Sequence, residues 1–243
     1  HKLSVESHGR MNYGPFTVGA LHAPSATIDE SGRLLSIFNV KEGKPIEGWT
    51  NVITLPRVLS LTEENDLRIE PVEEIDSLRF DHRQGDLIEI PAQAEIALEG
   101  IEGKAIEIEV AIDPGRAREV GLYVLSSPDR SERTRISFYP SDNRRFEEGS
   151  LQIDVSESSV RTDVHARTPE RGPLRLSEGE PLELRVYVDR SIVEVFANNR
   201  RYMTLRVHPD REDSRGSRIR AQGSDATLKS LDVWQMKTIW SSA

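Results

Sequence analysis

The sequence predicts an all-β protein, and three observations predict it: the period of the apolar residues, the spacing of the turn residues and the near absence of helical patterns. Apolar and polar residues alternate with a period of two, most clearly at Ile106, Ile108, Val110 and Ile112. Such alternation is typical of a strand with one buried face. Clusters of Gly, Pro, Asp and Ser separate these short stretches, which favours a sandwich or barrel.

The strand pattern is strongest in eight segments. We expect strands over residues 106–112, 120–125, 135–139, 151–155, 182–188, 192–196, 203–207 and 228–234. The segments between 182 and 207 predict a three-strand meander with turns at Asp189 to Ser191 and at Ala197 to Arg201. Asn198 and Asn199 suit the second turn because Asn tolerates positive φ.

The two faces of the first meander strand differ in polarity. Its even positions, from Leu182 to Val188, are all apolar and are expected to face a second sheet. Glu183, Arg185 and Tyr187 are expected to face outward.

The composition excludes several classes of partner. The chain has 41 acidic and 32 basic residues and a net charge of -9, which argues against nucleic acid and against an anionic membrane as partners. A neutral ligand such as a sugar is compatible with this charge. The absence of cysteine excludes disulfides and thiolate zinc sites. No apolar run approaches the ~20 residues of a membrane span, and residues 1–20 lack a signal-peptide pattern, so we expect a soluble chain whose compartment, secreted or cytoplasmic, stays open.

Few residues point to chemistry. The six histidines show no ligand spacing, so the sequence predicts no metal and no cofactor. A glycosidase needs two carboxylates beside the scissile bond, and Asp189 with Glu194 is the obvious pair. The interpretation we favour is a turn-capping Asp and an outward or salt-bridged Glu. Trp234, Trp240 and Tyr202 could stack on sugar rings, but packing roles are favoured.

Two strings of residues resemble glycoside hydrolase family 32. Residues 184–198, Leu-Arg-Val-Tyr-Val-Asp-Arg-Ser-Ile-Val-Glu-Val-Phe-Ala-Asn, resemble the V-D-x-S-x-x-E-x-F-x-N string of the family's C-terminal sandwich. Residues 48–61 are similar to the G-W-x-x-x-x-x-L-P-R-x-L-x-L segment that closes the propeller and enters the sandwich. A weaker match covers residues 8–14, 22–24 and 29–35, which look like the last propeller blade.

The resemblance implies a concanavalin-like, two-sheet antiparallel β-sandwich preceded by a fragment of a five-bladed β-propeller. Residues 1–61 would form the last blade and its closing segment, and residues 62–243 the sandwich, with the polar turn from Thr62 to Asp66 at the joint. Invertases, inulinases and levanases of this family cleave β-fructofuranosides with retention. Their catalytic motifs, W-x-N-D-P-N, R-D-P and E-C, are absent from this sequence, so no catalytic residue is carried over.

The last blade of the family lends walls to the substrate pocket. The family's G-R-R-I-L-W-G-W pattern appears here as residues 32–39, Gly-Arg-Leu-Leu-Ser-Ile-Phe-Asn, without its tryptophans. The resemblance therefore makes Phe38, Asn39 and His22 the candidate substrate-binding residues.

Two hypotheses about function follow. The first is a C-terminal supporting module of a β-fructofuranosidase that acts on sucrose or fructans, with the isolated chain inactive. Its expected partner is a missing N-terminal propeller portion or a second copy in a homo-oligomer. The start at His1, without an initiator methionine, suggests a processed product, a shortened chain or a split gene. The second hypothesis is a stand-alone carbohydrate-binding or oligomerisation β-sandwich without hydrolase activity.

Overall fold

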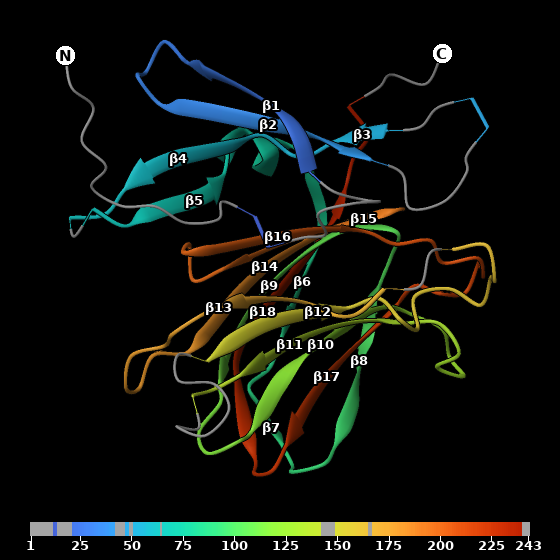
Figure 1. The fold of residues 1–243 in the computed structure, drawn as a ribbon. Coiled ribbons are helices and arrows are strands. Elements are labelled where there is room, and N and C mark those ends of the chain that lie inside the picture. The colour runs from blue at the N-terminus through green and yellow to red at the C-terminus, as the bar shows by residue number, and fades with distance from the viewer. Residues whose placement is uncertain are drawn as a thin grey trace.

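A computed structural model describes residues 12–13, 21–41, 47–48, 51–63, 65–141, 149–164 and 167–239. In these ranges the chain forms three antiparallel β-sheets and a short 3-10 helix, η1. Two of the sheets stack as a β-sandwich, and the third packs against the outer face of one of them (Figure 1).

The N-terminal sheet has the strand order β1-β2-β4-β5, with β3 also paired to β2. Its elements are β1 (Leu21–Ile28), β2 (Leu34–Lys41), β3 (Asn51–Ile53), β4 (Arg57–Leu61) and β5 (Leu67–Pro71), followed by η1 (Glu73–Leu78). The turn from Thr62 to Asp66 joins β4 to β5 as a hairpin, since the N–H of Thr62 donates to the carbonyl of Asp66 at 2.9 Å. The first sheet therefore extends beyond Leu61 to β5. The division of the chain into two domains at residues 61 and 62 stays a prediction.

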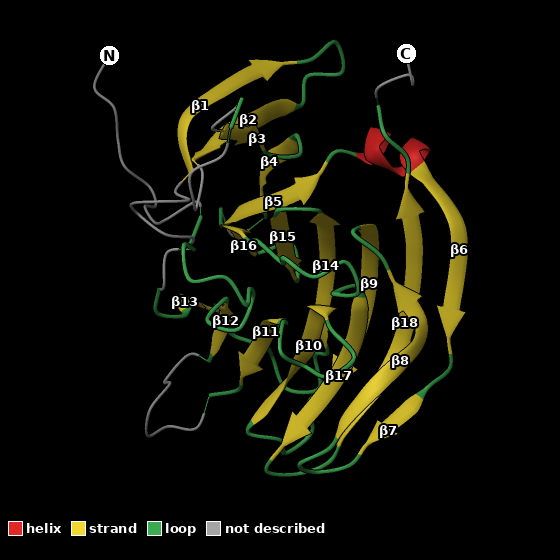
Figure 2. Ribbon diagram, turned by 90° about the vertical axis from the view of Figure 1, so that its right-hand side faces the viewer, coloured by secondary structure: helices red, strands yellow, loops and turns green. Residues whose placement is uncertain are grey.

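The sandwich has a six-stranded and a seven-stranded sheet (Figure 2). The first has the order β13-β12-β11-β10-β17-β8, and the second β16-β15-β14-β9-β18-β6, with β7 paired to β18. The strands are β6 (Arg79–Gly85), β7 (Ile88–Ile90), β8 (Glu95–Glu102), β9 (Ala105–Asp113), β10 (Glu119–Ser126), β11 (Thr134–Tyr139), β12 (Ser150–Asp154), β13 (Glu170–Pro173), β14 (Leu182–Asp189), β15 (Ile192–Ala197), β16 (Arg201–Arg206), β17 (Gly216–Gln222) and β18 (Ala226–Met236).

One apolar core fills the space between the two sandwich sheets. The alternating residues that predicted strands supply it, among them Ile108 of β9 and Val186 of β14, both fully buried. These two residues lie directly opposite each other in the antiparallel register. Burial of such rows on both inner faces is the main source of stability for a sandwich.

Six of the eight predicted segments lie wholly within strands, and the other two, 151–155 and 203–207, end one residue past β12 and β16. The all-β, two-sheet sandwich is confirmed. The meander is confirmed as well, because β14, β15 and β16 are neighbours. Asn198 and Asn199 both have positive φ, 48° and 51°. Tyr187 faces away from the main core, as predicted, but it is not exposed to solvent: it packs in a second cluster with residues of the N-terminal sheet and is 4% exposed.

Neither a membrane helix nor a metal cluster appears in the described ranges. None of the helical structure there has the length and apolar character needed to cross a membrane. The same ranges contain no group of three or more His, Asp or Glu side chains that could hold a metal ion.

Candidate functional site: the junction of the N-terminal sheet and the sandwich

A second apolar cluster, which we call the junction cluster, joins the N-terminal sheet to the outer face of the seven-stranded sheet. Its buried members are Ile69, Val72, Ile75, Tyr187, Phe196 and Tyr202. The ring of Phe196 lies 4.7 Å from that of Tyr202 and meets the ring of Tyr187 edge-on at 6.1 Å. Aromatic pairs in these geometries stabilise a contact beyond the area they bury. The N-terminal sheet is therefore packed onto the sandwich and not merely tethered to it.

A buried ion pair lies within this junction. The side chain of Arg57, in β4, is fully buried, and its Nη2 lies 3.6 Å from Oε2 of Glu194, in β15, whose side chain is 3% exposed. The N–H of Leu55 donates to Oε1 of Glu194 at 2.8 Å, and the hydroxyl of Tyr202 donates to Oε2. Burial raises the pKa of the Glu194 carboxyl, and the charge of Arg57 opposes that shift.

Aromatic rings complete the surroundings of Arg57. Its guanidinium carbon lies 4.0 Å from the ring centroid of Tyr202 and 4.8 Å from that of Phe38. Nη2 also donates to the carbonyl of Leu55 at 3.1 Å, whereas Nε and Nη1 find no hydrogen-bond partner in the part of the chain that the structure describes. A desolvated cation over an aromatic face gains about 2 kcal/mol, which helps to offset the burial of this charge. The arrangement is suited to holding two modules in one fixed orientation.

A second charged cluster connects η1 to the same sheet. Arg185 of β14 contacts Asp76 of η1 at 2.6 Å and Glu107 of β9 at 2.5 Å, and Arg79 contacts Glu107 at 2.7 Å. The Glu107 side chain is fully buried. Burial alone would raise its pKa, but the two arginines outweigh that effect and hold the pKa below its usual range. Glu107 is thus ionised at neutral pH and anchors both arginines.

The candidate substrate-binding residues do not share one face of the N-terminal sheet. His22 of β1 and Asn39 of β2 are directly opposite each other. Within the described residues, Nδ1 of His22 and Oδ1 of Asn39 are buried without a hydrogen-bond partner. Phe38 points to the opposite face, since neighbouring residues in a strand alternate, and its buried ring contacts Arg57. A substrate-binding role for the three residues stays a prediction.

The structure separates Asp189 and Glu194 by environment. Asp189 is exposed at the end of β14, whereas Glu194 is buried in the junction. The interpretation of Glu194 as a salt-bridged residue is confirmed, although it is a buried bridge and not one at the surface.

The aromatic residues considered for sugar stacking have packing roles where they can be assessed. Tyr202 is fully buried, and Trp234 has the guanidinium of Arg79 3.9 Å from its ring centroid and the ring of His82 stacked at 4.7 Å. Trp240, and Trp49 of the second family-like string, lie outside the described residues.

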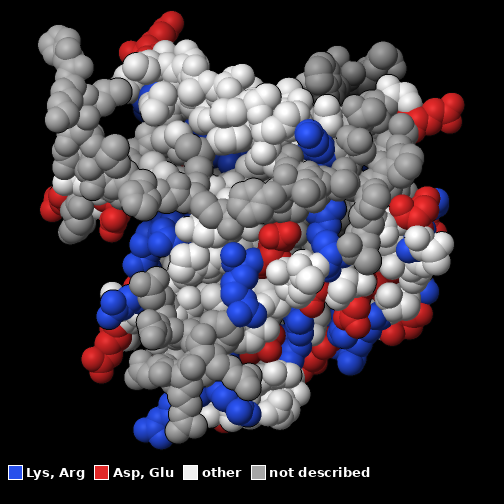
Figure 3. All heavy atoms as spheres, in the orientation of Figure 1, with Lys and Arg blue, Asp and Glu red and all other residues white. Residues whose placement is uncertain are grey.

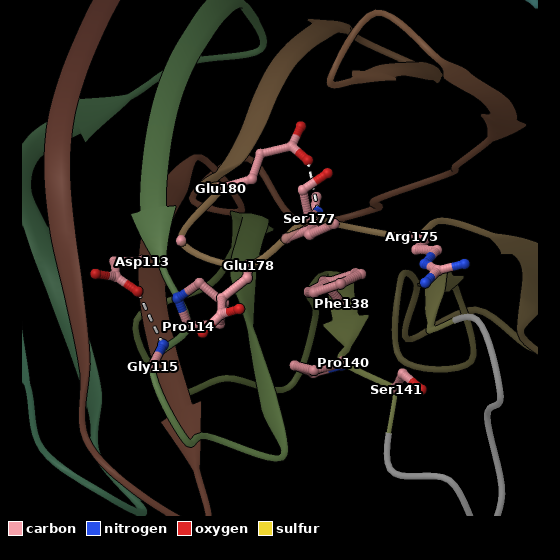
Figure 4. Close-up of a pocket in the computed structure, with 12 residues that line it drawn as sticks. Asp113, Pro114, Gly115, Phe138, Pro140, Ser141, Arg175, Ser177, Glu178 and Glu180 are labelled. Carbon is pink, nitrogen blue, oxygen red and sulfur yellow. Dashed lines mark hydrogen bonds between the residues drawn. The ribbon is translucent and has the colours of Figure 1, made fainter.

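A pocket of about 430 Å³ opens at the end of the sandwich, between the loop after β9 and the loop before β14 (Figure 4). Asp113 and Glu180 lie on its rim, and Phe138 lies between them and Ser141. Both carboxylates stabilise local turns, because Asp113 accepts from the N–H of Gly115 at 3.0 Å and Glu180 from the N–H of Ser177 at 2.8 Å. We therefore do not assign these two as a catalytic pair.

Reasoning from the residues alone missed the junction. Arg57 and Glu194 are 137 positions apart, and no periodicity links them. The available signal was that each lies in one of the two strings that resemble the family.

Comparisons with known proteins agree with this architecture. The family model described as "Glycosyl hydrolases family 32 C terminal" matches residues 74–235. An acid beta-fructofuranosidase of Vicia faba is 32% identical over 227 residues, which cover 79% of this chain and 35% of that protein. A levanase of Bacillus subtilis is 31% identical over 204 residues, covering 81% of this chain and 29% of the levanase.

Solved structures share the fold. The crystal structure of fructan 1-exohydrolase IIa from Cichorium intybus aligns with a TM-score of 0.82 and 20% identity, over 94% of this chain and 49% of that one. A fructosyltransferase from A. japonicus aligns with a TM-score of 0.79 and 18% identity, over 100% and 48% of the two chains. The chain thus spans about a third of the length of these sequence relatives and about half of the aligned structures.

The family model covers most of the sandwich, and the two strings that meet in the junction are the ones that resemble the family. This chain belongs to glycoside hydrolase family 32, and its sandwich is the C-terminal module of that family.

Proposed function

We propose that the chain is the supporting module of a β-fructofuranosidase-type hydrolase that acts on sucrose or fructans, and that its N-terminal sheet is the last blade of a five-bladed propeller. The buried Arg57–Glu194 pair is the observation that carries this proposal. A charged pair enclosed between two sheets fixes their relative orientation, because any displacement would leave a buried charge unpaired. Such rigidity is what a sandwich needs in order to hold a blade in place.

An apolar row of residues on the N-terminal sheet is an argument for a further partner that is itself built of β-strands. Ile28, Leu34, Leu59 and Ile69 are directly opposite one another across β1, β2, β4 and β5. Ile69 is 2% exposed in the junction, but Leu34 is 40% and Ile28 69% exposed, so the row extends past the sandwich. Figure 3 shows charged side chains gathered over the sandwich and few over β1 and β2.

The expected occupant of this row is the remaining part of a propeller, with a second copy of the chain as the other possibility. An exposed apolar row beside the edge strand β1 invites another sheet. Sedimentation of the chain distinguishes these two occupants: a monomer supports the remaining part of a propeller as the occupant. A dimer that Ile28→Asp dissociates identifies a second copy instead.

The stand-alone carbohydrate-binding hypothesis receives less support. Sugar-binding modules present aromatic faces to their ligands, and among the described residues both Trp234 and Tyr202 are engaged in packing. Binding of inulin or levan to the chain without turnover would favour this hypothesis.

Activity measurements test the proposal directly. We expect the 243-residue chain to release no reducing sugar from sucrose, inulin or levan, because the carboxylate motifs of the family's catalytic site are absent from its sequence. The intact mass of the protein from its native source is the companion measurement. A mass near twice 27.4 kDa would support a larger fructosidase, and turnover by the chain alone would contradict the proposed role.

A further inference from the structure

The two sheets of the sandwich leave a seam where their edge strands meet. β16 is the edge of the seven-stranded sheet, and β13 is the edge of the six-stranded sheet. Across this seam, which we define as β13 and β16, Nε of Arg201 donates to the carbonyl of Pro173 at 2.6 Å. Edge strands expose unpaired backbone groups and the margin of the apolar core, so they are usually covered.

Two residues far away in the sequence cover this seam. The backbone N–H of Tyr13 donates to the carbonyl of Tyr202 at 3.4 Å, and the N–H of Thr204 donates to Oδ1 of Asn12 at 3.1 Å. Tyr202 and Thr204 are alternate residues of β16, so both contacts occupy the free edge of that strand. Asn12 and Tyr13 thereby lie along the edge of β16, one through its side-chain oxygen and the other through its backbone N–H.

The side chain of Tyr13 enters the seam itself. It packs against the main core of the sandwich and lies against the backbone of Gly172 in β13. A β-carbon built on Gly172 would lie 2.6 Å from Cγ of Tyr13, and the three nearest atoms all belong to Tyr13. Gly172 does not have a positive φ, so the ring alone, and not the backbone conformation, excludes a side chain at this position.

We infer that Asn12–Tyr13 is a strap that closes the sandwich, so the core of the C-terminal module is completed by residues that precede the N-terminal sheet. The strap occupies the edge of β16, while Leu55 and Arg57 engage Glu194 of the neighbouring strand. Two N-terminal segments therefore contribute part of the core of the sandwich and part of its buried hydrogen bonds. A sandwich that began at residue 62 would lack these contacts. This inference does not depend on the proposed function.

A double-mutant cycle in the full chain tests the strap. We expect Gly172→Ala to lower the midpoint of thermal unfolding by about 3 to 10 °C, because the added methyl group overpacks against the Tyr13 ring. Tyr13→Ala alone should lower the midpoint by a similar amount through the cavity that it leaves. In the double variant most of the cost of Gly172→Ala should disappear, since the clashing ring is gone.

A matched cycle serves as the control. Tyr123 lies on β10, three strands from β13 in the same sheet, so Tyr123→Ala and Gly172→Ala should have additive effects. Two results would overturn the inference: a wild-type midpoint for Gly172→Ala, or additivity of Gly172→Ala with Tyr13→Ala. Each would mean that the Tyr13 ring does not occupy the seam in solution.

Discussion

Replacing Arg57 by methionine is expected to lower the free energy of unfolding by about 3–5 kcal/mol, the usual cost of removing one partner from a buried ion pair. The substitution keeps much of the apolar volume but leaves the Glu194 carboxylate enclosed without a counter-charge. It also removes the guanidinium from the faces of Tyr202 and Phe38. Chemical denaturation followed by circular dichroism measures the change, with an unaltered m-value showing that the unfolding transition itself is preserved.

A neighbouring arginine provides the control for this experiment. Arg68 pairs with Glu70 at 2.7 Å on β5, but its side chain is 47% exposed, so Arg68→Met should change the free energy by no more than about 1 kcal/mol. Adding Glu194→Gln to Arg57→Met should restore part of the lost stability, because no unpaired charge is then buried. If Arg57→Met were as mild as Arg68→Met, the ion pair would not hold the junction together.

The second large effect is expected at Glu132, which is fully buried in the loop between β10 and β11. Its Oε1 accepts from the N–H groups of Val160 and Asp210 at 2.8 and 2.9 Å. Its Oε2 accepts from the N–H of Arg211 at 3.0 Å and from the hydroxyl of Ser214 at 2.6 Å. One carboxylate thus ties three loop segments together.

We expect Glu132→Gln to lower the free energy of unfolding by about 2–4 kcal/mol at pH 7, since hydrogen bonds to a charged group contribute about 1.5–3 kcal/mol each. The glutamine amide has one acceptor oxygen, so its NH₂ group must face at least one backbone N–H whichever way it is turned. Glu157→Gln is the matched control, because Glu157 is 57% exposed and pairs with Arg133 at the surface. Equal effects of the two substitutions would refute the proposed role of Glu132.

The stabilisation by Glu132 should depend on pH in a defined direction. Burial tends to raise the pKa of this carboxyl, but the Ser214 hydroxyl and the three N–H donors outweigh burial and hold it below the ordinary value of 4.5. A lowered folded-state pKa means that the stabilisation is complete above pH 4.5 and is lost as the pH falls through the folded-state value. Unfolding of wild type and Glu132→Gln between pH 7 and pH 3 should therefore show a difference that narrows toward low pH. A difference that is constant over this range would contradict the assignment.

The fold was predictable where apolar alternation is strong. Ile106 to Ile112 and Leu182 to Val188 have the period-two pattern of strands with one face on a core, and both are central strands of the seven-stranded sheet. The strand β17 was missed because its buried positions include Ser217 and Ala221, which are too small or too polar to mark a face by sequence alone. A weak alternation around Ile219 was the available signal.

The junction was less predictable because it depends on which outer face is covered. Tyr187 alternates correctly with its apolar neighbours, yet nothing in the strand pattern indicates that another sheet lies over it. The same holds for Glu194, whose position between Val193 and Val195 fits a solvated face as well as a buried ion pair. Whether an outer face is buried depends on how two sheets pack against each other. That packing is set by residues far apart in the chain.

The sequence by itself determined the all-β class, the meander with its Asn turn, the absence of the family's catalytic motifs and, through two strings of residues, the resemblance to family 32. These features are local, because alternation and turn chemistry act over a few residues. Only the tertiary structure decided that Arg57 pairs with Glu194, that Trp234 packs against Arg79 and His82, and that Tyr13 occupies the seam. The physical reason is that charge compensation and close packing depend on groups distant in the chain, and their positions exist only once the sheets have stacked.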